Sequence, residues 1–327
     1  MKIELAIKFG SDEIILFRKG IGIVARQSTY VAVSNQTNKI CAFDNDAKKL
    51  CDERQDKYKL IQPIKGVEII DKRLAVELID NILSKSVESK INISALVAVP
   101  CAMTEKKLLE LKIVLQDAGI RKVDFVQNGT CVRIGEFEFK DSDEVMVVDI
   151  GKYLTDISVV SRYKFSFGRD YFIGGEEMDV AVQTYIEDNY DVCITKLMAE
   201  KVKREIASLY ENDMYTISFD GITKDDSYKN ITVRANEIRV AIIGIYDKIF
   251  DLIEEVFEVL PSETLAQIKR NGIVFTGGVS CVAGLSEYAT QRLGVPVINI
   301  LNPQDSVILG AGKLLTIPRE DYPHINL

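Results

Sequence analysis

Two short segments combine a glycine with polar residues in a pattern that suits the binding of phosphate groups. Gly10–Asp12 and Gly151–Tyr153 each lie between two apolar runs, as a tight turn between strands would. Glycine adopts positive φ and lets other groups approach the main chain, so several backbone N–H groups of such a turn can converge on an anion. Each segment is therefore a candidate phosphate cradle, although each could also be an ordinary hairpin turn.

A third glycine-rich segment and one acidic residue could complete such a site. Ile273–Thr276 is an apolar run that leads into Gly277 and Gly278, and a helix is expected soon after, near residues 283–293. A ligand can lie against bare backbone of this kind, close to the positive end of a helix. Asp149 ends the apolar run before Gly151, where a carboxylate can hold a metal-bound water beside a phosphate. Alternatively, Asp149 only caps the turn that follows it.

Composition argues against several other kinds of chemistry. The 327 residues contain one histidine, His324, which argues against Ser-His-Asp and Cys-His mechanisms. The six cysteines are scattered and form no C-x-x-C, so neither a zinc site nor a disulfide framework is expected. The net charge of −8, without a long Lys/Arg cluster, argues against a nucleic-acid partner. No apolar run is long enough to span a bilayer, and we expect a cytoplasmic protein.

The elements that would position these residues alternate between strands and helices. The apolar positions of residues 235–260 repeat in alternating steps of four and three, and Pro261 ends this pattern. This stripe predicts a helix packed in the core rather than a coiled coil. Further helices are expected at residues 71–88, 104–118, 175–189, 196–209 and 303–315. Strands are expected at residues 3–9, 13–18, 21–25, 29–34, 95–100, 145–150, 154–161, 164–172, 214–220, 228–234, 272–275 and 296–300.

Both halves of the chain open with the same pattern. Residues 6–15 and 147–156 each contain an apolar strand, a glycine, a short polar turn and a second strand. This weak repeat predicts two similar domains that face each other across a cleft. The charged stretch at residues 136–144 places the boundary, giving domains at 1–142 and 143–327. Small insertions are expected at about 31–66 and about 176–236.

Several of these segments resemble the MreB family of bacterial actin homologues. Val147–Gly151 and Ile173–Asp179 are similar to its second phosphate segment, Ala199–Tyr210 to its nucleotide-contacting helix, and Phe275–Leu285 to its adenosine segment. The similarity follows the family order and covers nearly the whole chain. It implies an actin-like (ribonuclease H-like) α/β fold, in which two similar domains flank a nucleotide cleft and each carries a smaller inserted subdomain.

The resemblance also implies which residues contact a bound ATP or ADP. In chain order they are Lys8, Gly10, Ser11, Gly151, Lys152, Lys203, Arg204, Gly277 and Gly278. Asp149 is the remaining candidate for a metal ligand and, together with Asn128, for a catalytic role.

The hydrolytic side departs from the family pattern. Lys8 stands where the family has an acid that organises magnesium, and Lys152-Tyr153 follows Gly151 where the family has further glycines. The water-orienting glutamate of the family falls at Asn128 or Gln127, and an amide cannot act as a carboxylate base, although either could orient a water. The chain is therefore expected to be at most a weak ATPase, and a requirement for Mg²⁺ is not expected.

Two consequences of these departures stay open. Lys8 and Lys152 could neutralise the phosphates directly and make the metal dispensable. Alternatively, the cleft no longer binds nucleotide, Lys8 points to solvent, and Tyr153 fills the space of the phosphates.

The resemblance implies a cell-shape cytoskeletal protein that forms filaments, by self-association or by co-assembly with related actin-like proteins. Cell-wall synthesis proteins and membrane-associated proteins would be further partners, in the cytoplasm or at the inner face of the membrane. The alternative is a non-filamentous scaffold or chaperone-like binding protein with a degenerate nucleotide site. A sugar or acetate kinase is least favoured, because Lys8 and Asn128 replace the acids that such an enzyme needs.

Overall fold

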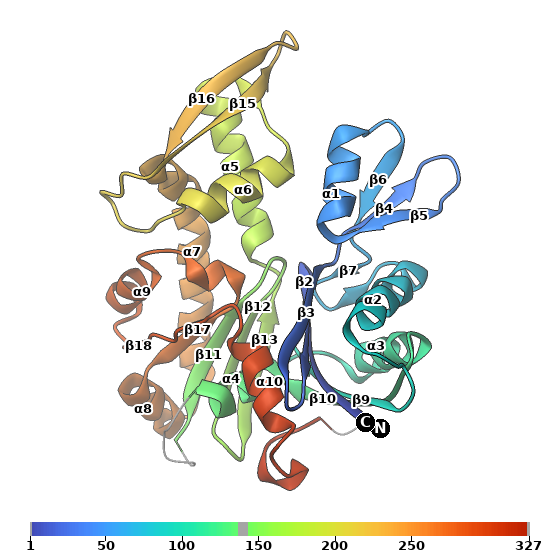
Figure 1. Ribbon diagram of the computed structural model, residues 1–327. Helices are drawn as coiled ribbons and strands as arrows, with labels where there is room; N and C mark the ends of the chain where they lie inside the picture. The colour runs from blue at the N-terminus through green and yellow to red at the C-terminus, as the bar shows by residue number, and fades with distance from the viewer. Residues whose placement is uncertain (1, 137–142, 326–327) are drawn as a thin grey trace. The chain divides into compact units, whose positions relative to one another are not determined.

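Strand β1 (Ile3–Phe9) lies in the middle of the first five-stranded sheet of this computed structural model, which describes residues 2–136 and 143–325. The sheet has the order β10-β9-β1-β2-β3 (Figure 1). β1 runs antiparallel to β2 (Glu13–Arg18) and parallel to β9 (Ile93–Val99). The edges are β3 (Gly22–Ser28) and β10 (Ile120–Gln127). Almost every residue of β9 is buried, as expected for a strand covered on both faces.

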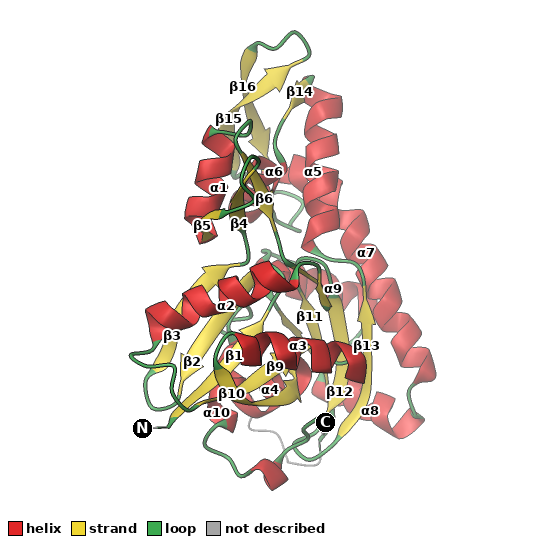
Figure 2. Ribbon diagram, turned by 90° about the vertical axis from the view of Figure 1, so that its right-hand side faces the viewer, coloured by secondary structure: helices red, strands yellow, loops and turns green. Residues whose placement is uncertain are grey.

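Helices cover both faces of this sheet. Figure 2 shows α2 (Lys72–Ser86) and α3 (Glu105–Asp117) in front of it, where their apolar residues share one core with β1 and β9. Helices α4 (Asn128–Glu136) and α10 (Ser306–Leu314) contact the sheet from the other face. Thr104 caps α3 by accepting the N–H of Lys107.

A small sheet with the order β5-β4-β6 occupies the polar region expected as the first insertion. Its strands are β4 (Val31–Ser34), β5 (Ile40–Phe43) and β6 (Tyr58–Ile61), and α1 (Asp44–Glu53) packs on them. They have a small core of their own, formed by Tyr30, Ala32, Ala47 and Cys51. The two-residue strands β7 (Ile64–Lys65) and β8 (Glu68–Ile69) then lead back toward α2.

The second five-stranded sheet has the order β13-β12-β11-β17-β18. Its strands are β11 (Val145–Ile150), β12 (Thr155–Val160), β13 (Phe165–Tyr171), β17 (Ile273–Thr276) and β18 (Val297–Ile298). Read from its edge strand β3, the first sheet has the order β3-β2-β1-β9-β10. It matches the second sheet strand by strand, with β1 in the place of β11 and β9 in the place of β17. β1 pairs in parallel with β9, as β11 does with β17. The repeat seen in the sequence is therefore a repeat of sheet topology.

The remaining helices and strands follow β13. The helices are α5 (Gly175–Tyr190), α6 (Lys196–Ile206), α7 (Ala235–Val259), α8 (Ser262–Asn271) and α9 (Leu285–Leu293). A three-stranded sheet contains β14 (Val192–Cys193), β15 (Thr216–Thr223) and β16 (Tyr228–Arg234). α7 buries Ile238, Ile242, Ile245 and Ile249, which confirms the core position predicted for most of this stripe, whereas Val259 at its end is exposed.

The chain forms two units, each discontinuous in the sequence. The first contains residues 1–143, 156–170 and 305–327, and the second contains residues 144–155 and 171–304. The sequence predicted a single division at 142–143, within a stretch of which residues 137–142 lie outside the described ones. Residues from 305 onward join the first unit because α10 packs on α4, where a Cβ added to Gly310 would lie 1.9 Å from the Cys131 carbonyl oxygen. Among the described residues, no helix is both long and apolar enough to cross a bilayer.

Candidate functional site

The second glycine turn, at Gly151–Tyr153, packs onto the start of α5. The Gly151 N–H donates to the Leu154 carbonyl at 2.8 Å and closes the turn. The carbonyls of Gly151 and Lys152 accept the N–H groups of Gly175 at 3.0 Å and Glu176 at 2.7 Å. These N–H groups belong to the first turn of a helix, where no partner within the helix exists. A Cβ at Gly174 would lie 2.4 Å from the Gly151 carbonyl oxygen, so this contact requires a glycine there.

The third glycine segment lies against the end of β11. Gly277 has a φ of +90°, and a Cβ there would lie 2.4 Å from the Ile150 carbonyl oxygen and 2.5 Å from Asp149 Oδ1. Its N–H donates to the Pro303 carbonyl at 2.9 Å. At Gly278, by contrast, an added Cβ would meet no atom within 4 Å. Gly277 therefore fixes the segment, and the backbone of Gly278 has open space beside it.

A group of charged side chains, buried except for Arg204, joins the second turn to α6. Lys152 Nζ lies 2.9 Å from Glu200 Oε2, and Arg204 lies 2.8 Å from the other oxygen of the same carboxylate. Lys203 Nζ donates to the Gly175 carbonyl at 2.8 Å and forms an ion pair with Asp179 at 2.5 Å. Lys152 and Arg204 thus pair with Glu200, and Lys203 pairs with Asp179.

Asp179 is the most buried acid of this group, with 1% of its surface exposed. Burial raises the pKa of the Asp179 carboxyl, and Lys203 acts in the opposite direction. Lys203 therefore stabilises the charged form of this carboxylate.

The second unit therefore brings together most of the predicted site residues. It contains Asp149, Gly151, Lys152, Lys203, Arg204, Gly277 and Gly278. Asp149 is 8% exposed and stands next to Thr276 in the parallel pairing of β11 with β17. The first unit contains the other four candidates, Lys8, Gly10, Ser11 and Asn128.

The first glycine turn connects β1 to β2. The Gly10 N–H donates to the Glu13 carbonyl at 3.1 Å, and a Cβ at Gly10 would lie 2.7 Å from that oxygen. Lys8 is partly buried near the end of β1, opposite Ile15. Burial raises the pKa of the Glu13 carboxyl, while Arg26 and Lys8 act in the opposite direction. Lys8 thus contributes positive charge to the first turn.

Asn128 begins α4 directly after β10 and is 6% exposed. The next residue, Gly129, lies so close to β12 that an added Cβ would fall 2.0 Å from Ser158 Oγ. A glycine is required at this junction, and it holds Asn128 in place at the end of the sheet.

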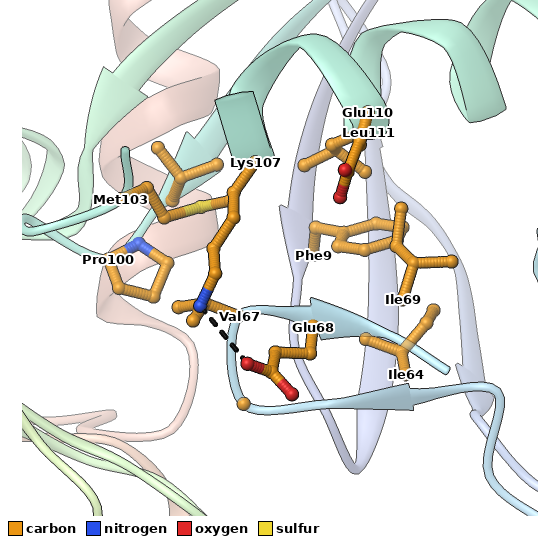
Figure 3. A pocket seen from close by; sticks show the side chains of 12 residues that line it. Phe9, Ile64, Val67, Glu68, Ile69, Pro100, Met103, Lys107, Glu110 and Leu111 are labelled. Atoms are coloured by element: carbon orange, nitrogen blue, oxygen red, sulfur yellow. Dashed lines mark hydrogen bonds and ion pairs between the residues drawn. The ribbon is translucent and has the colours of Figure 1, made fainter. Parts of the chain in front are cut away.

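An apolar pocket lies beside the first turn (Figure 3). Phe9, Ile64 and Leu111 contribute to its wall, and Lys107 Nζ lies 3.3 Å from Glu68 Oε1 in an ion pair of two lining residues. Gly66 also lines it, and its carbonyl accepts the hydroxyl of Ser11 at 3.2 Å. Gly66 therefore links the wall of the pocket to the turn. The sequence did not predict it, because its walls come from segments far apart in the chain.

Sequence reasoning also missed the acids of the charged group. Glu200 lies inside the segment that resembled a nucleotide-contacting helix, and Asp179 at the end of a phosphate-type segment. Neither acid has a local sequence pattern that indicates a role for it. Their partners lie 48 and 24 residues away along the chain, so no local spacing could have shown the ion pairs.

The chain matches known proteins along nearly its whole length. The family model described as MreB/Mbl protein matches residues 2–321. The cell shape-determining protein MreB of Escherichia coli (strain K12) is 27% identical over 95% of this chain and 93% of its own length. The cell shape-determining protein Mbl of Bacillus subtilis (strain 168) is 26% identical over 95% of each chain.

Solved structures give the same answer for the fold. The crystal structure of MreB5 of Spiroplasma citri bound to AMPPNP superposes with a TM-score of 0.91, covering 97% of this chain and 96% of that chain at 23% identity. A MamK double helical filament gives a TM-score of 0.81 at 19% identity, covering 97% and 99% of the two chains. These similarities confirm the actin-like fold that the sequence predicted.

Proposed function

Because this chain belongs to the MreB/Mbl family, we propose that it is a cell-shape cytoskeletal protein that binds ATP and ADP and assembles into filaments. Its relatives support each part. MreB and Mbl are described as cell shape-determining proteins, MreB5 has been solved with AMPPNP and with ADP, and MamK as a double helical filament. The observation that carries the proposal is the glycine packing in the second unit. Gly277 is fixed against the end of β11 and leaves the backbone of Gly278 open to a ligand.

In the proposed site, the adenosine lies on Gly277–Gly278 and the second glycine turn faces the phosphates. Lys203 and Arg204 both lie in the last turn of α6, and Lys203 supplies positive charge beside Gly175. Lys152 contributes less to phosphate binding than its sequence position suggests, because its ammonium group is already paired with Glu200. A phosphate would compete with Glu200 for this ammonium group.

The residues do not fit a magnesium site of the usual kind. Asp149 is the acid that the resemblance retains, and Lys8 places a positive charge where a second acid would be needed. Mg²⁺ prefers carboxylate and phosphate oxygens together with water, and a lysine opposes it. We therefore propose nucleotide binding with little dependence on Mg²⁺. Asn128 could orient a water but not remove its proton, which limits the chain to weak ATP hydrolysis.

Isothermal titration with ATP and with ADP, each with Mg²⁺ and with EDTA, tests this proposal. Measurable affinity that changes little when Mg²⁺ is removed is the expected result. Strong Mg²⁺-dependent binding with fast turnover would reject the weakened site. Absence of binding under all four conditions would reject nucleotide binding itself.

A second candidate is a non-filamentous scaffold of the same fold. The Lys152–Glu200 pair favours it, because Glu200 already neutralises a cation that the resemblance assigns to the phosphates. Electron microscopy at rising protein concentration, with and without nucleotide, separates the two. Filaments support the first candidate, and a persistent monomer or closed dimer supports the second.

A further inference from the structure

Tyr246 on α7 holds the carbonyl of Val279, the residue that follows Gly278. Its hydroxyl donates to the Val279 carbonyl oxygen at 2.9 Å. Tyr246 is 1% exposed, and a buried tyrosine hydroxyl needs a hydrogen-bond partner. Burial raises the pKa of the Tyr246 hydroxyl well above its ordinary value, so the group stays protonated and remains a donor. This hydrogen bond ties the core of the second unit to the segment proposed to bind adenosine.

Gly278 and Val279 are the two central residues of a tight turn. The Ser280 N–H donates to the Gly277 carbonyl at 3.2 Å and closes this turn. The peptide group between Val279 and Ser280 is therefore bonded at both ends. Its N–H closes the turn, and its carbonyl accepts the hydroxyl of Tyr246. Because a peptide group is planar, bonds at both ends fix its orientation.

The chain before Gly278 is fixed as well. The Gly277 N–H and the Thr276 hydroxyl both donate to the Pro303 carbonyl, at 2.9 and 2.7 Å. Gly278 itself is exposed, and none of the described atoms lies within 4 Å of a Cβ added to it. The open backbone of Gly278 therefore lies between two anchors, Pro303 on one side and Tyr246 on the other.

We propose that Tyr246 is a positioning residue for the adenosine moiety of the nucleotide. Its hydroxyl holds the turn in one orientation, so that the backbone of Gly278 is a fixed surface and binding does not have to order the turn. This inference rests on the proposed nucleotide binding. It concerns adenosine alone and needs only residues of the second unit.

Isothermal titration of Tyr246→Phe with adenosine and with ATP tests the inference. The change removes the hydroxyl and keeps the ring, which lies 6.4 Å from the ring of Phe250 between centroids. Affinity for both ligands is expected to fall by about fivefold to tenfold, the effect of one hydrogen bond. The two losses should be equal, because adenosine and ATP share the moiety that lies on the turn.

Tyr288→Phe provides a matched control. The Tyr288 hydroxyl donates to Asp247 Oδ1 of α7 at 2.7 Å, and its ring lies 5.8 Å from that of Phe250 between centroids. This variant also loses one tyrosine hydrogen bond to α7, but that bond does not hold the turn. Tyr288→Phe should therefore leave adenosine affinity within about twofold of the wild type. Equal losses of adenosine affinity in the two variants would show a purely structural role and would overturn the inference.

Amide hydrogen exchange without ligand gives a second, independent readout. The Ser280 amide, which closes the turn, should exchange faster in Tyr246→Phe than in the wild type, and Tyr288→Phe should leave its rate unchanged. An unchanged Ser280 rate in Tyr246→Phe would overturn the inference. If the wild-type protein binds neither adenosine nor ATP, the proposed function itself fails. Wild-type binding that Tyr246→Phe leaves unchanged overturns only the role of Tyr246.

Discussion

Lys152 Nζ lies 2.9 Å from Glu200 Oε2, with only 8% and 9% of the two side chains exposed. The pair joins the second glycine turn to α6, and Arg204 adds a second cation to the same carboxylate at 2.8 Å. Removing one member of a buried ion pair leaves its partner's charge uncompensated, which costs more than losing an exposed pair.

A double-mutant cycle of Lys152→Met and Glu200→Gln should therefore give a large coupling energy. We expect each single change to lower the free energy of unfolding by about 2–4 kcal/mol and the pair to couple by about 1–3 kcal/mol. Lys201 and Glu205 on the same helix, 3.9 Å apart and half exposed, form the control pair. Their coupling should stay below about 0.5 kcal/mol. Chemical denaturation measures both cycles. Equal coupling energies for Lys152–Glu200 and Lys201–Glu205 would refute the structural role of the buried pair.

Two adjacent glycines should respond differently to alanine. Gly277→Ala forces a methyl onto the Ile150 carbonyl and strains a φ of +90°, so it should lower both stability and nucleotide affinity. Gly278→Ala meets no protein atom within 4 Å, so the melting temperature should not change. If adenosine lies on this backbone, the methyl should still weaken ATP binding by about tenfold. Unchanged affinity in Gly278→Ala would place the ligand elsewhere.

The close crossing of α4 and α10 gives a prediction about stability alone. A Cβ at Gly310 would lie 1.9 Å from the Cys131 carbonyl oxygen, so Gly310→Ala should lower the free energy of unfolding by about 3 kcal/mol or more. Gly244, exposed inside α7 with open space around it, is the control. Gly244→Ala should raise stability by about 0.5–1 kcal/mol, because alanine favours a helix. Similar denaturation midpoints for the two variants would contradict the close packing of α4 on α10.

Helix α4 shows why part of the fold escaped sequence analysis. Its sequence begins Asn128-Gly129-Thr130-Cys131, residues that rarely favour helices, and it forms because small residues let it pack on α10 and β12. α7 could be predicted because its apolar stripe is local and long. The sequence does not predict α8, because Pro261 ends the apolar stripe of the preceding helix, although proline also suits a helix start.

The candidate site shows the same difference between residues with a local sequence signal and residues that only the tertiary fold brings together. The glycine turns could be predicted because backbone freedom is a property of single residues. The charged group could not, because Lys152 and Glu200 meet only through the tertiary fold. Gln62 and Thr29 could not be predicted for the same reason, because only the tertiary fold brings both side chains to the Ser11 carbonyl.

Cys101 should be an unusually unreactive thiol. Its sulfur donates to Asp170 Oδ1 at 3.2 Å, and its N–H donates to Asp156 Oδ2 at 3.1 Å. Burial, followed by the charges of Asp156 and Asp170, raises the pKa of the Cys101 thiol well above its ordinary value. The reactive thiolate therefore forms only at more alkaline pH.

Alkylation with iodoacetamide, followed by mass spectrometry, checks this thiol. At pH 8, Cys101 should react at least about tenfold more slowly than the exposed Cys41, because each unit of raised pKa removes tenfold of the thiolate. The Cys101 rate should keep rising above the pH at which an ordinary thiol levels off, about 9. Asp170→Asn should increase the rate at pH 8. Matching pH profiles for Cys101 and Cys41 would disprove the raised pKa.

The charge of Lys8 should decide how far nucleotide binding depends on magnesium. Lys8 lies near the end of β1 beside the first turn, and its charge acts on Glu13 there. In Lys8→Asp, a carboxylate takes the place of the ammonium. Without Mg²⁺ this negative charge should repel the phosphates, and with Mg²⁺ the carboxylate can hold a metal-bound water that restores binding.

We expect ATP affinity in Lys8→Asp to fall about tenfold or more in EDTA and to recover with Mg²⁺, while the wild type changes little. Lys59→Asp makes the same charge change at an exposed position of β6 and should leave both affinities near those of the wild type. If Lys8→Asp gains no dependence on Mg²⁺ in isothermal titration, Lys8 does not replace the metal, and its position at the first turn serves the fold alone.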